Sequence, residues 1–166
     1  MKNLYMTLLM AAAILAMNAC AKNQVKEPVN VGANNAFVTA SNKQLAKYPV
    51  TGFAYKSSAV PGQQWKMWAR VATPVVKDIL GKIPDGYVLE VRGHADASGP
   101  EQPEGDKPGN MNISRDRAQA VFKSLESAGI ESRKITYKGV GSSELLTGYA
   151  PRSGQQRRVS FSIVPQ

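Results

Sequence analysis

Hydrophobic positions from residue 50 onward repeat in two periods, one typical of strands and the other of helices. Residues that favour strands form four short blocks, at residues 50–55, 87–94, 135–140 and 157–164. Apolar residues at helical spacing predict two amphipathic helices between them, one over residues 63–82 and one from near Ser114 to Gly129. This order predicts an α+β fold, a two-layer sandwich in which the helices pack on one face of a mixed four-stranded sheet.

Two features of the first predicted helix bear on its packing. Trp65 and Trp68 lie on its apolar side, and we expect both to anchor the core. Pro74 lies within the helix and predicts either a kink or a later start, because proline lacks a backbone N–H.

The start of the chain has a different pattern. Lys2 is the only charged residue before Lys22, and the stretch from Leu4 to Met17 is mostly Leu, Met, Ala and Ile. A basic start and a short apolar run are typical of a secretory signal, and the run is too short to cross a bilayer. The run ends at Cys20, the only cysteine in the chain, so an internal disulfide is excluded.

The position of this cysteine resembles the lipobox of bacterial lipoproteins. The resemblance implies a signal peptide over residues 1–19 and a lipid chain, such as palmitate, on Cys20. The alternative is an ordinary signal peptide cut after Ala21, since the residues on both sides of the cysteine are small. A lipid anchor would hold the protein at a membrane through the burial of its acyl chains.

The segment between the apolar run and the first predicted strand shows no sustained helical or alternating pattern. Residues 20–49 are therefore expected to form an acylated cysteine and a flexible tether, with a root-mean-square span of about 30 Å. Alternatively, Phe37, Leu45 and Tyr48 pack onto the folded domain, which we expect to span residues 50–166.

The charge of the chain narrows the choice of partner only a little. Among 166 residues there are 21 Lys and Arg against 12 Asp and Glu, a net charge of +9. Such a positive charge favours polyanions as binding partners. The basic residues are spread from Lys2 to Arg158 instead of forming one patch, and the export signal also disfavours nucleic acid as a partner.

An enzymatic function would depend on His94, the only histidine. His94, Asp96 and Ser98 alternate along one predicted strand and would face the same way, which superficially resembles a hydrolytic trio. Residues on the same face of a strand lie about 6–7 Å apart, which is unsuitable for a Ser–His hydrogen bond. One histidine without a second cysteine also excludes the common zinc sites. We therefore expect no enzyme activity, no metal and no cofactor.

Three motifs occur in order along the predicted domain. The first is Gly-His-Ala-Asp-Ala-Ser-Gly at residues 93–99, at the end of a strand. The second, at residues 110–118, opens a helix, and the third is Gln-Arg-Arg-Val at residues 156–159. Together they resemble the OmpA-like C-terminal domain, the module shared with peptidoglycan-associated lipoproteins. The resemblance covers residues 50–164.

This resemblance implies non-covalent binding of the peptidoglycan stem peptide at its diaminopimelate residue, which presents an ammonium and a carboxylate at one carbon. Asp96 matches the residue expected to pair with the ammonium, and Arg117 the residue expected to grip the carboxylate. The predicted helix start near Ser114 would add free backbone N–H groups to the carboxylate site.

Three further residues are candidates for the same site. Asn110 matches the asparagine of the family and is expected to hydrogen-bond the stem. Arg157 would add a second cation for the acidic peptide, and Ser98 lies at the edge of the loop.

The sequence departs from the family pattern around these candidates. Ala95 stands where the family usually has Thr, and Gln156 where it has Asn. Phe53 is followed by Ala-Tyr-Lys at residues 54–56 in place of the usual acidic residue. The loop over residues 99–109 is longer than is common, and it is acidic through Glu101, Glu104 and Asp106. We therefore expect the rim of the site to differ from that of the family.

The combined interpretation is an outer-membrane lipoprotein whose domain faces the periplasm, binds peptidoglycan and tethers the membrane to the cell wall. Its partners would be the stem peptide, the membrane through the lipid anchor, and other envelope proteins. The alternative is a surface-exposed adhesin or host-interaction lipoprotein on the same scaffold, which would use the long loop.

Overall fold

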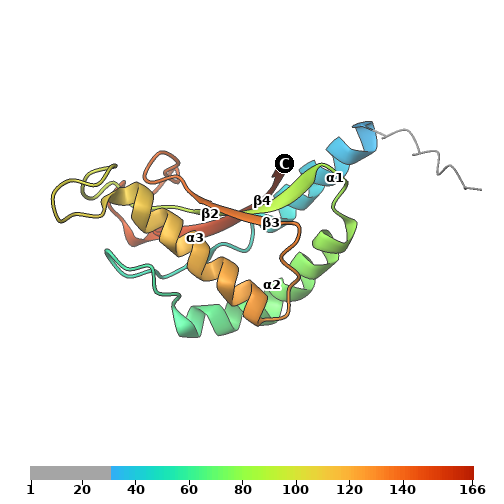
Figure 1. Ribbon diagram of the computed structural model, residues 1–166, viewed down its shortest axis with the longest axis horizontal. Helices are drawn as coiled ribbons and strands as arrows, with labels where there is room; N and C mark the ends of the chain where they lie inside the picture. Colours follow the sequence, from blue (N-terminus) through green and yellow to red (C-terminus); the bar gives the residue numbers. More distant parts are fainter. Residues whose placement is uncertain (1–30) are drawn as a thin grey trace, which may run out of the picture.

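The computed structural model describes residues 31–166, so the expected signal peptide and Cys20 lie outside the described residues. Figure 1 shows the arrangement of the elements. In chain order they are α1 (Val31–Leu45), β1 (Val50–Thr51), α2 (Gly62–Lys82), β2 (Tyr87–Gly93), α3 (Gly109–Ser127), β3 (Ile135–Gly139), the 3-10 turn η1 (Gly154–Gln156) and β4 (Arg158–Pro165).

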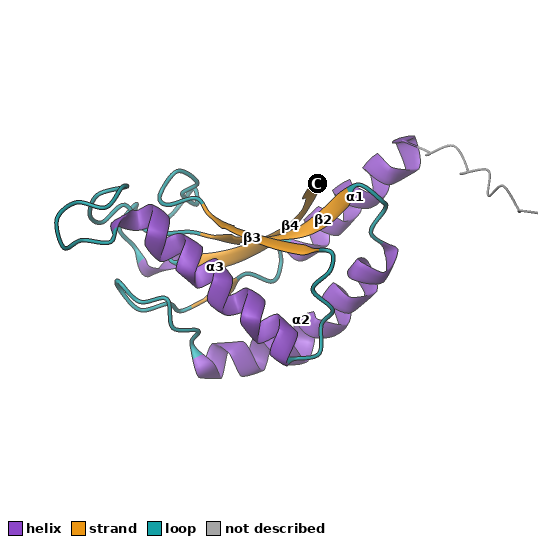
Figure 2. Cartoon of the chain, viewed as in Figure 1, coloured by secondary structure: helices purple, strands orange, loops and turns teal. Residues whose placement is uncertain are grey.

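The strands form one open, mixed sheet in the order β1-β4-β2-β3. β2 runs parallel to β3, whereas β4 is antiparallel to both β1 and β2. Val159, Phe161 and Ile163 alternate along β4 and point into the core, as the strict alternation of this segment predicted. Figure 2 shows α2 and α3 together on one side of the sheet. The predicted α+β fold class is confirmed.

The predicted core position of the tryptophans agrees with the structure. Trp68 is buried, its ring lies 5.1 Å from that of Phe161, and Trp65 stacks on it at 4.9 Å. Pro74 lies inside α2, which continues through it from Gly62. α2 changes direction along its length (Figure 1), which is consistent with the predicted kink.

The tether prediction is wrong for residues 31–45, which form α1. This helix lies along the edge of β4 that the short β1 leaves uncovered. The side chain of Asn42 accepts a hydrogen bond from the N–H of Ile163 at 2.6 Å and donates one to its carbonyl at 3.1 Å. Leu45 is buried in the core, as the alternative interpretation proposed. The asparagine thus occupies strand-edge groups that would otherwise stay unpaired.

The first strand is shorter than expected, because it ends at Thr51 instead of residue 55. Gly52 adopts a φ of +88°, a conformation that interrupts extended backbone. The carbonyls of Phe53 and Ala54, which a longer strand would use in its ladder, instead accept hydrogen bonds from Arg157 and Arg117. The segment after β1 is therefore a turn held by arginine side chains.

The helix α3 begins at Gly109, earlier than the predicted start near Ser114. It packs closely on the sheet because two glycines leave room for its backbone. A Cβ atom on Gly93 would lie 1.9 Å from the Ser114 carbonyl oxygen, and one on Gly139 would lie 2.3 Å from the Arg115 nitrogen. These contacts fix the first turns of α3 over the ends of β2 and β3. No helix within residues 31–166 has the length and apolar character needed to cross a membrane.

Candidate functional site

A pocket of about 100 Å³ lies where β2 ends and α3 begins. Its walls come from the turn after β1, from the loop between β2 and α3, from the first turns of α3, and from the residue that precedes β4. All five residues predicted for ligand binding line it, namely Asp96, Ser98, Asn110, Arg117 and Arg157. The fold thus brings three motifs that are far apart in sequence to one site.

Asp96 is the acidic group of this pocket, and it is buried. One carboxylate oxygen accepts a hydrogen bond from Arg157 Nη1 at 2.7 Å, and the other accepts one from the Ser98 N–H at 2.9 Å. Arg157 is fixed in turn, since its Nε donates to the Phe53 carbonyl at 2.8 Å. A buried carboxylate needs such partners, so in the free protein Asp96 and Arg157 neutralise each other.

Arg117 has a structural role that the motif did not predict. Only 1% of its surface is exposed, and its guanidinium donates to three backbone carbonyls. Nε donates to Ser57 at 2.8 Å, Nη1 to His94 at 3.0 Å and Nη2 to Ala54 at 3.1 Å. Arg117 therefore joins α3 to the turn after β1 and to the end of β2. Its binding of a ligand carboxylate, through its remaining N–H groups, stays a prediction.

Burial also changes the acidity of this arginine. Removal from water and the positive charge of Arg157 lower the pKa of Arg117, the negative charge of Asp96 partly opposes them, and the net result is a pKa of about 10. The guanidinium still carries its charge at neutral pH. The pocket therefore contains a charged arginine that cannot move without breaking three hydrogen bonds.

The expected carboxylate site at free N–H groups near Ser114 is wrong. Because α3 begins earlier, Ser114 lies inside the helix, where its hydroxyl donates to the Met111 carbonyl at 2.9 Å. Near the actual start of the helix, the N–H groups of Asn110 and Met111 donate to the carbonyls of Pro100 and Glu101 at 2.9 and 3.0 Å. The long loop after β2 thus occupies two amides that would otherwise be available to an anion.

Glu101 holds this loop in place. Its carboxylate accepts hydrogen bonds from the Ser142 hydroxyl at 2.7 Å and from the Ser142 N–H at 3.1 Å. It packs so closely on Gly141 that a Cβ atom there would overlap it. From the sequence, Glu101 was only one of three acidic residues in a long loop, and no motif marks it as a loop clamp.

The structure does not form a hydrolytic trio from His94, Asp96 and Ser98. The imidazole Nε2 of His94 lies 2.8 Å from the Ser160 hydroxyl, while Asp96 is bonded to Arg157. Within residues 31–166, no group of three or more His, Cys, Asp or Glu residues could hold a metal ion.

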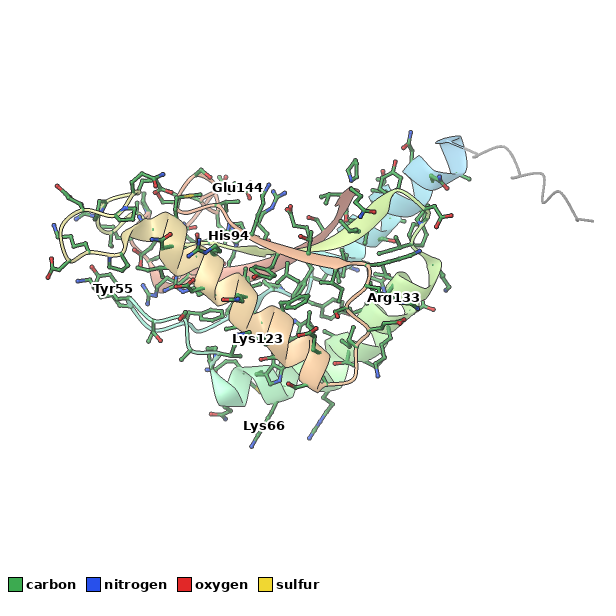
Figure 3. All side chains as sticks on the ribbon, viewed as in Figure 1. Tyr55, Lys66, His94, Lys123, Arg133 and Glu144 are labelled. Atoms are coloured by element: carbon green, nitrogen blue, oxygen red, sulfur yellow. The ribbon has the colours of Figure 1, made fainter. Side chains whose placement is uncertain are left out.

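The environment of His94 keeps its ring neutral. Burial, together with the positive charges of Arg158 and Arg92, lowers the pKa of this imidazole to about 3. Nδ1 has no hydrogen-bond partner within residues 31–166 and lies 3.8 Å from the Glu144 carboxylate. Figure 3 shows His94 near Glu144, on the end of the sheet that carries the loops.

Comparison with known proteins identifies the domain. The sequence model of the OmpA family matches residues 71–158, which is more than half of the chain and includes all five predicted site residues. The chain belongs to the OmpA family. No curated protein matches it by sequence.

Solved structures of OmpA-like domains share this fold. The OmpA-like domain of FopA1 from Francisella tularensis is 25% identical with a TM-score of 0.50, over 69% of this chain and 70% of that one. The peptidoglycan-associated lipoprotein from Burkholderia pseudomallei is 19% identical with a TM-score of 0.55, over 77% and 99%. The C-terminal domain of Helicobacter pylori MotB is 18% identical with a TM-score of 0.53, over 71% and 86%. At these two lower identities, the likeness shows the fold alone.

Proposed function

We propose that this OmpA-like domain binds peptidoglycan non-covalently through the diaminopimelate residue of the stem peptide. The observation that carries the proposal is the pocket in which five residues from three motifs meet around the buried pair of Asp96 and Arg157. One protein of the same fold is, by its title, a peptidoglycan-associated lipoprotein. We further propose that the chain is an outer-membrane lipoprotein, anchored through Cys20, with its domain in the periplasm.

The chemistry of the ligand suits the paired charges of the pocket. The side chain of diaminopimelate ends in a carbon that bears both an ammonium and a carboxylate. The ammonium would bond to Asp96, while the carboxylate would bond to Arg157 and Arg117. The Asp96–Arg157 ion pair of the free protein would then be replaced by two new contacts, one between Asp96 and the ligand ammonium and one between the arginines and the ligand carboxylate. No buried charge would lose its partner.

This arrangement predicts discrimination between wall types. A stem with lysine in place of diaminopimelate keeps the ammonium but lacks the carboxylate. The two arginines would then face a ligand without an acceptor, and a site that leaves a polar group unpaired rejects such a ligand strongly. We expect sacculi with diaminopimelate to retain the protein and sacculi with lysine to release it.

The experiment is a pull-down of the full chain, in mild detergent, with purified diaminopimelate-type sacculi. Asp96→Asn is expected to abolish binding, because it removes the charge that pairs with the ammonium. The matched control is Asp116→Asn, which changes an exposed carboxylate on α3 and should bind like the wild type. Circular dichroism verifies that both variants are folded.

Two results would contradict the proposal. Absence of wild-type binding would mean that the pocket takes another ligand, and the adhesin interpretation, which no observation here favours, would be tested next. Undiminished binding of the Asp96→Asn variant would place the wall contact elsewhere on the domain.

The lipid anchor needs its own test, because Cys20 lies outside the described residues. Cells that express the full chain are grown with a labelled fatty acid, and the label on the protein is measured. The wild type is expected to carry it and to be found in the outer-membrane fraction, whereas Cys20→Ser should lose both properties. Label on the Cys20→Ser variant would refute acylation at this position.

A further inference from the structure

The pocket carries more positive than negative charge. Its charged lining consists of four cations and one carboxylate, namely Lys56, Lys107, Arg117, Arg157 and Asp96. The two arginines are bonded to backbone carbonyls, and Arg157 also pairs with Asp96. Within residues 31–166, neither lysine forms an ion pair with a carboxylate. The Lys56 ammonium lies 5.4 Å from the centre of the exposed Tyr55 ring, a contact that leaves its charge without a carboxylate partner. Two lysine ammonium groups at the pocket can therefore pair with an anionic ligand.

Lys56 is presented by a turn with an unusual backbone. It has a φ of +57° and is the only non-glycine residue with positive φ within residues 31–166. The turn is closed by a hydrogen bond from the Ser57 N–H to the Ala54 carbonyl at 3.2 Å, and Arg117 donates to the carbonyls of both Ala54 and Ser57. Such conformations persist only when the surroundings impose them, and they are common at ligand sites. Figure 3 shows the neighbouring Tyr55 at the same end of the molecule as the loops.

Lys107 comes from the long loop between β2 and α3, on the other wall of the pocket. It exchanges backbone hydrogen bonds with Glu104 at 3.1 and 3.0 Å, which forms a small hairpin within the loop. Glu101 fixes the base of the loop to Ser142. Both lysines therefore lie on segments that depart from the family pattern, and both segments are held by specific bonds.

We propose that Lys56 and Lys107 form an anion subsite at the rim of the pocket, which selects stem peptides with a free second carboxylate near the diaminopimelate. The inference rests on the proposed function. The carboxyl group of the glutamyl residue that precedes diaminopimelate is the natural candidate, because it occurs free in some walls and amidated in others. Amidation removes the charge with little change in size, so the two forms are matched ligands for the subsite.

The size of the preference follows from the exposure of the lysines. Both side chains are exposed, so each contact with a carboxylate is an ion pair in water. Such pairs contribute a factor of roughly two to five each in binding. We therefore expect the free-acid stem to bind about fivefold to twentyfold more tightly than the amidated stem. The preference should shrink as salt is raised, because exposed charges are screened over about 8 Å at physiological ionic strength.

The experiment measures binding of two soluble muropeptides to the full chain by calorimetry. Both contain diaminopimelate, and they differ only in amidation of the glutamyl carboxylate. Lys56→Gln and Lys107→Gln are each expected to weaken binding of the free-acid form and to leave binding of the amidated form unchanged. Lys66→Gln and Lys123→Gln remove lysines of α2 and α3 that do not line the pocket, and they serve as matched controls (Figure 3).

The possible failures are distinguishable. Equal wild-type affinities for the two muropeptides would overturn the subsite while leaving the proposed function intact. An equal loss in the Lys66→Gln or Lys123→Gln control would also overturn it, since the net charge and not the subsite would then set the preference. Wild-type binding of neither muropeptide would overturn the proposed function itself and this inference with it.

Discussion

The buried imidazole of His94 links the stability of the domain to pH. In the folded protein, burial and two nearby arginines hold the pKa of His94 at about 3, below its ordinary value of 6.5. The unfolded chain has no such constraint, so its histidine binds a proton as the pH falls below about 6.5 while the folded protein does not. The unfolded state then binds more protons, and the free energy of unfolding decreases.

The size of this decrease in unfolding free energy follows from the difference between the folded and unfolded pKa values of His94. The stability associated with the neutral ring is fully present above the unfolded pKa of 6.5 and is lost as the pH falls toward the folded pKa of about 3. The full loss is about 5 kcal/mol. About 2 kcal/mol of it is expected between pH 7 and pH 5, before most carboxylates begin to titrate. His94 is the only histidine in the chain, so no other histidine contributes in this window.

The assay is urea unfolding followed by tryptophan fluorescence at pH 7 and at pH 5. Trp68 lies in the core and Trp65 packs against it, so their fluorescence reports the loss of the core. The wild type is expected to lose about 2 kcal/mol of unfolding free energy between these pH values. His94→Gln, which keeps a polar group near Ser160 but cannot titrate, is expected to lose almost none. A loss in this variant equal to that of the wild type would refute the role of the imidazole.

Three further predictions concern close contacts in the fold. Gly93→Ala should destabilise the domain by at least about 3 kcal/mol, measured by urea unfolding, because its methyl group would collide with the Ser114 carbonyl. Asn42→Ala should cost about 1–2 kcal/mol in the same assay and speed amide exchange at Ile163, because it removes both side-chain bonds to β4; unchanged exchange would show that α1 does not protect this edge. Glu101→Gln should cost about 1 kcal/mol and increase proteolysis of its loop without unfolding the core, since its charged bonds tie the loop to Ser142 at the surface of the domain. Equal proteolysis of this variant and the wild type would argue against the clamp.

The sequence predicted the elements whose hydrophobic period is regular. Strict alternation located β4, and helical spacing located α2. Helix α1 was missed because few of its residues are buried, so it lacks a clear apolar stripe, and because its polar attachment to β4 through the Asn42 side chain leaves no periodic signal in the sequence. The end of β1 was misplaced because the effect of Gly52 depends on its φ, which the strand-favouring residues around it do not reveal.

The features of the candidate site also divide into those that the sequence predicted and those that only the structure shows. The motifs identified Asp96, Asn110 and Arg157 as neighbours, because a shared fold fixes where those positions meet. They could not show that Arg117 is committed to three carbonyls, since hydrogen-bond partners distant in sequence depend on the folded backbone. The lysines of the rim lie where the sequence leaves the family pattern, so only the three-dimensional structure could bring them to one pocket.

The placement of α1 bears on how the domain would respond to mechanical force. α1 and the pocket lie at opposite ends of the sheet (Figure 1). If the chain is held at its N-terminal side and the cell wall is bound at the pocket, force acts along the strands. In that direction many hydrogen bonds between neighbouring strands resist the force together. The seam between α1 and β4 would give way first, because the helix is held there by the two Asn42 hydrogen bonds and by the packing of Leu45 against the core, and not by a ladder of strand hydrogen bonds. Its release would let residues 31–45 extend from about 22 Å as a helix to about 50 Å as an open chain, so the helix would act as an extensible spacer under load.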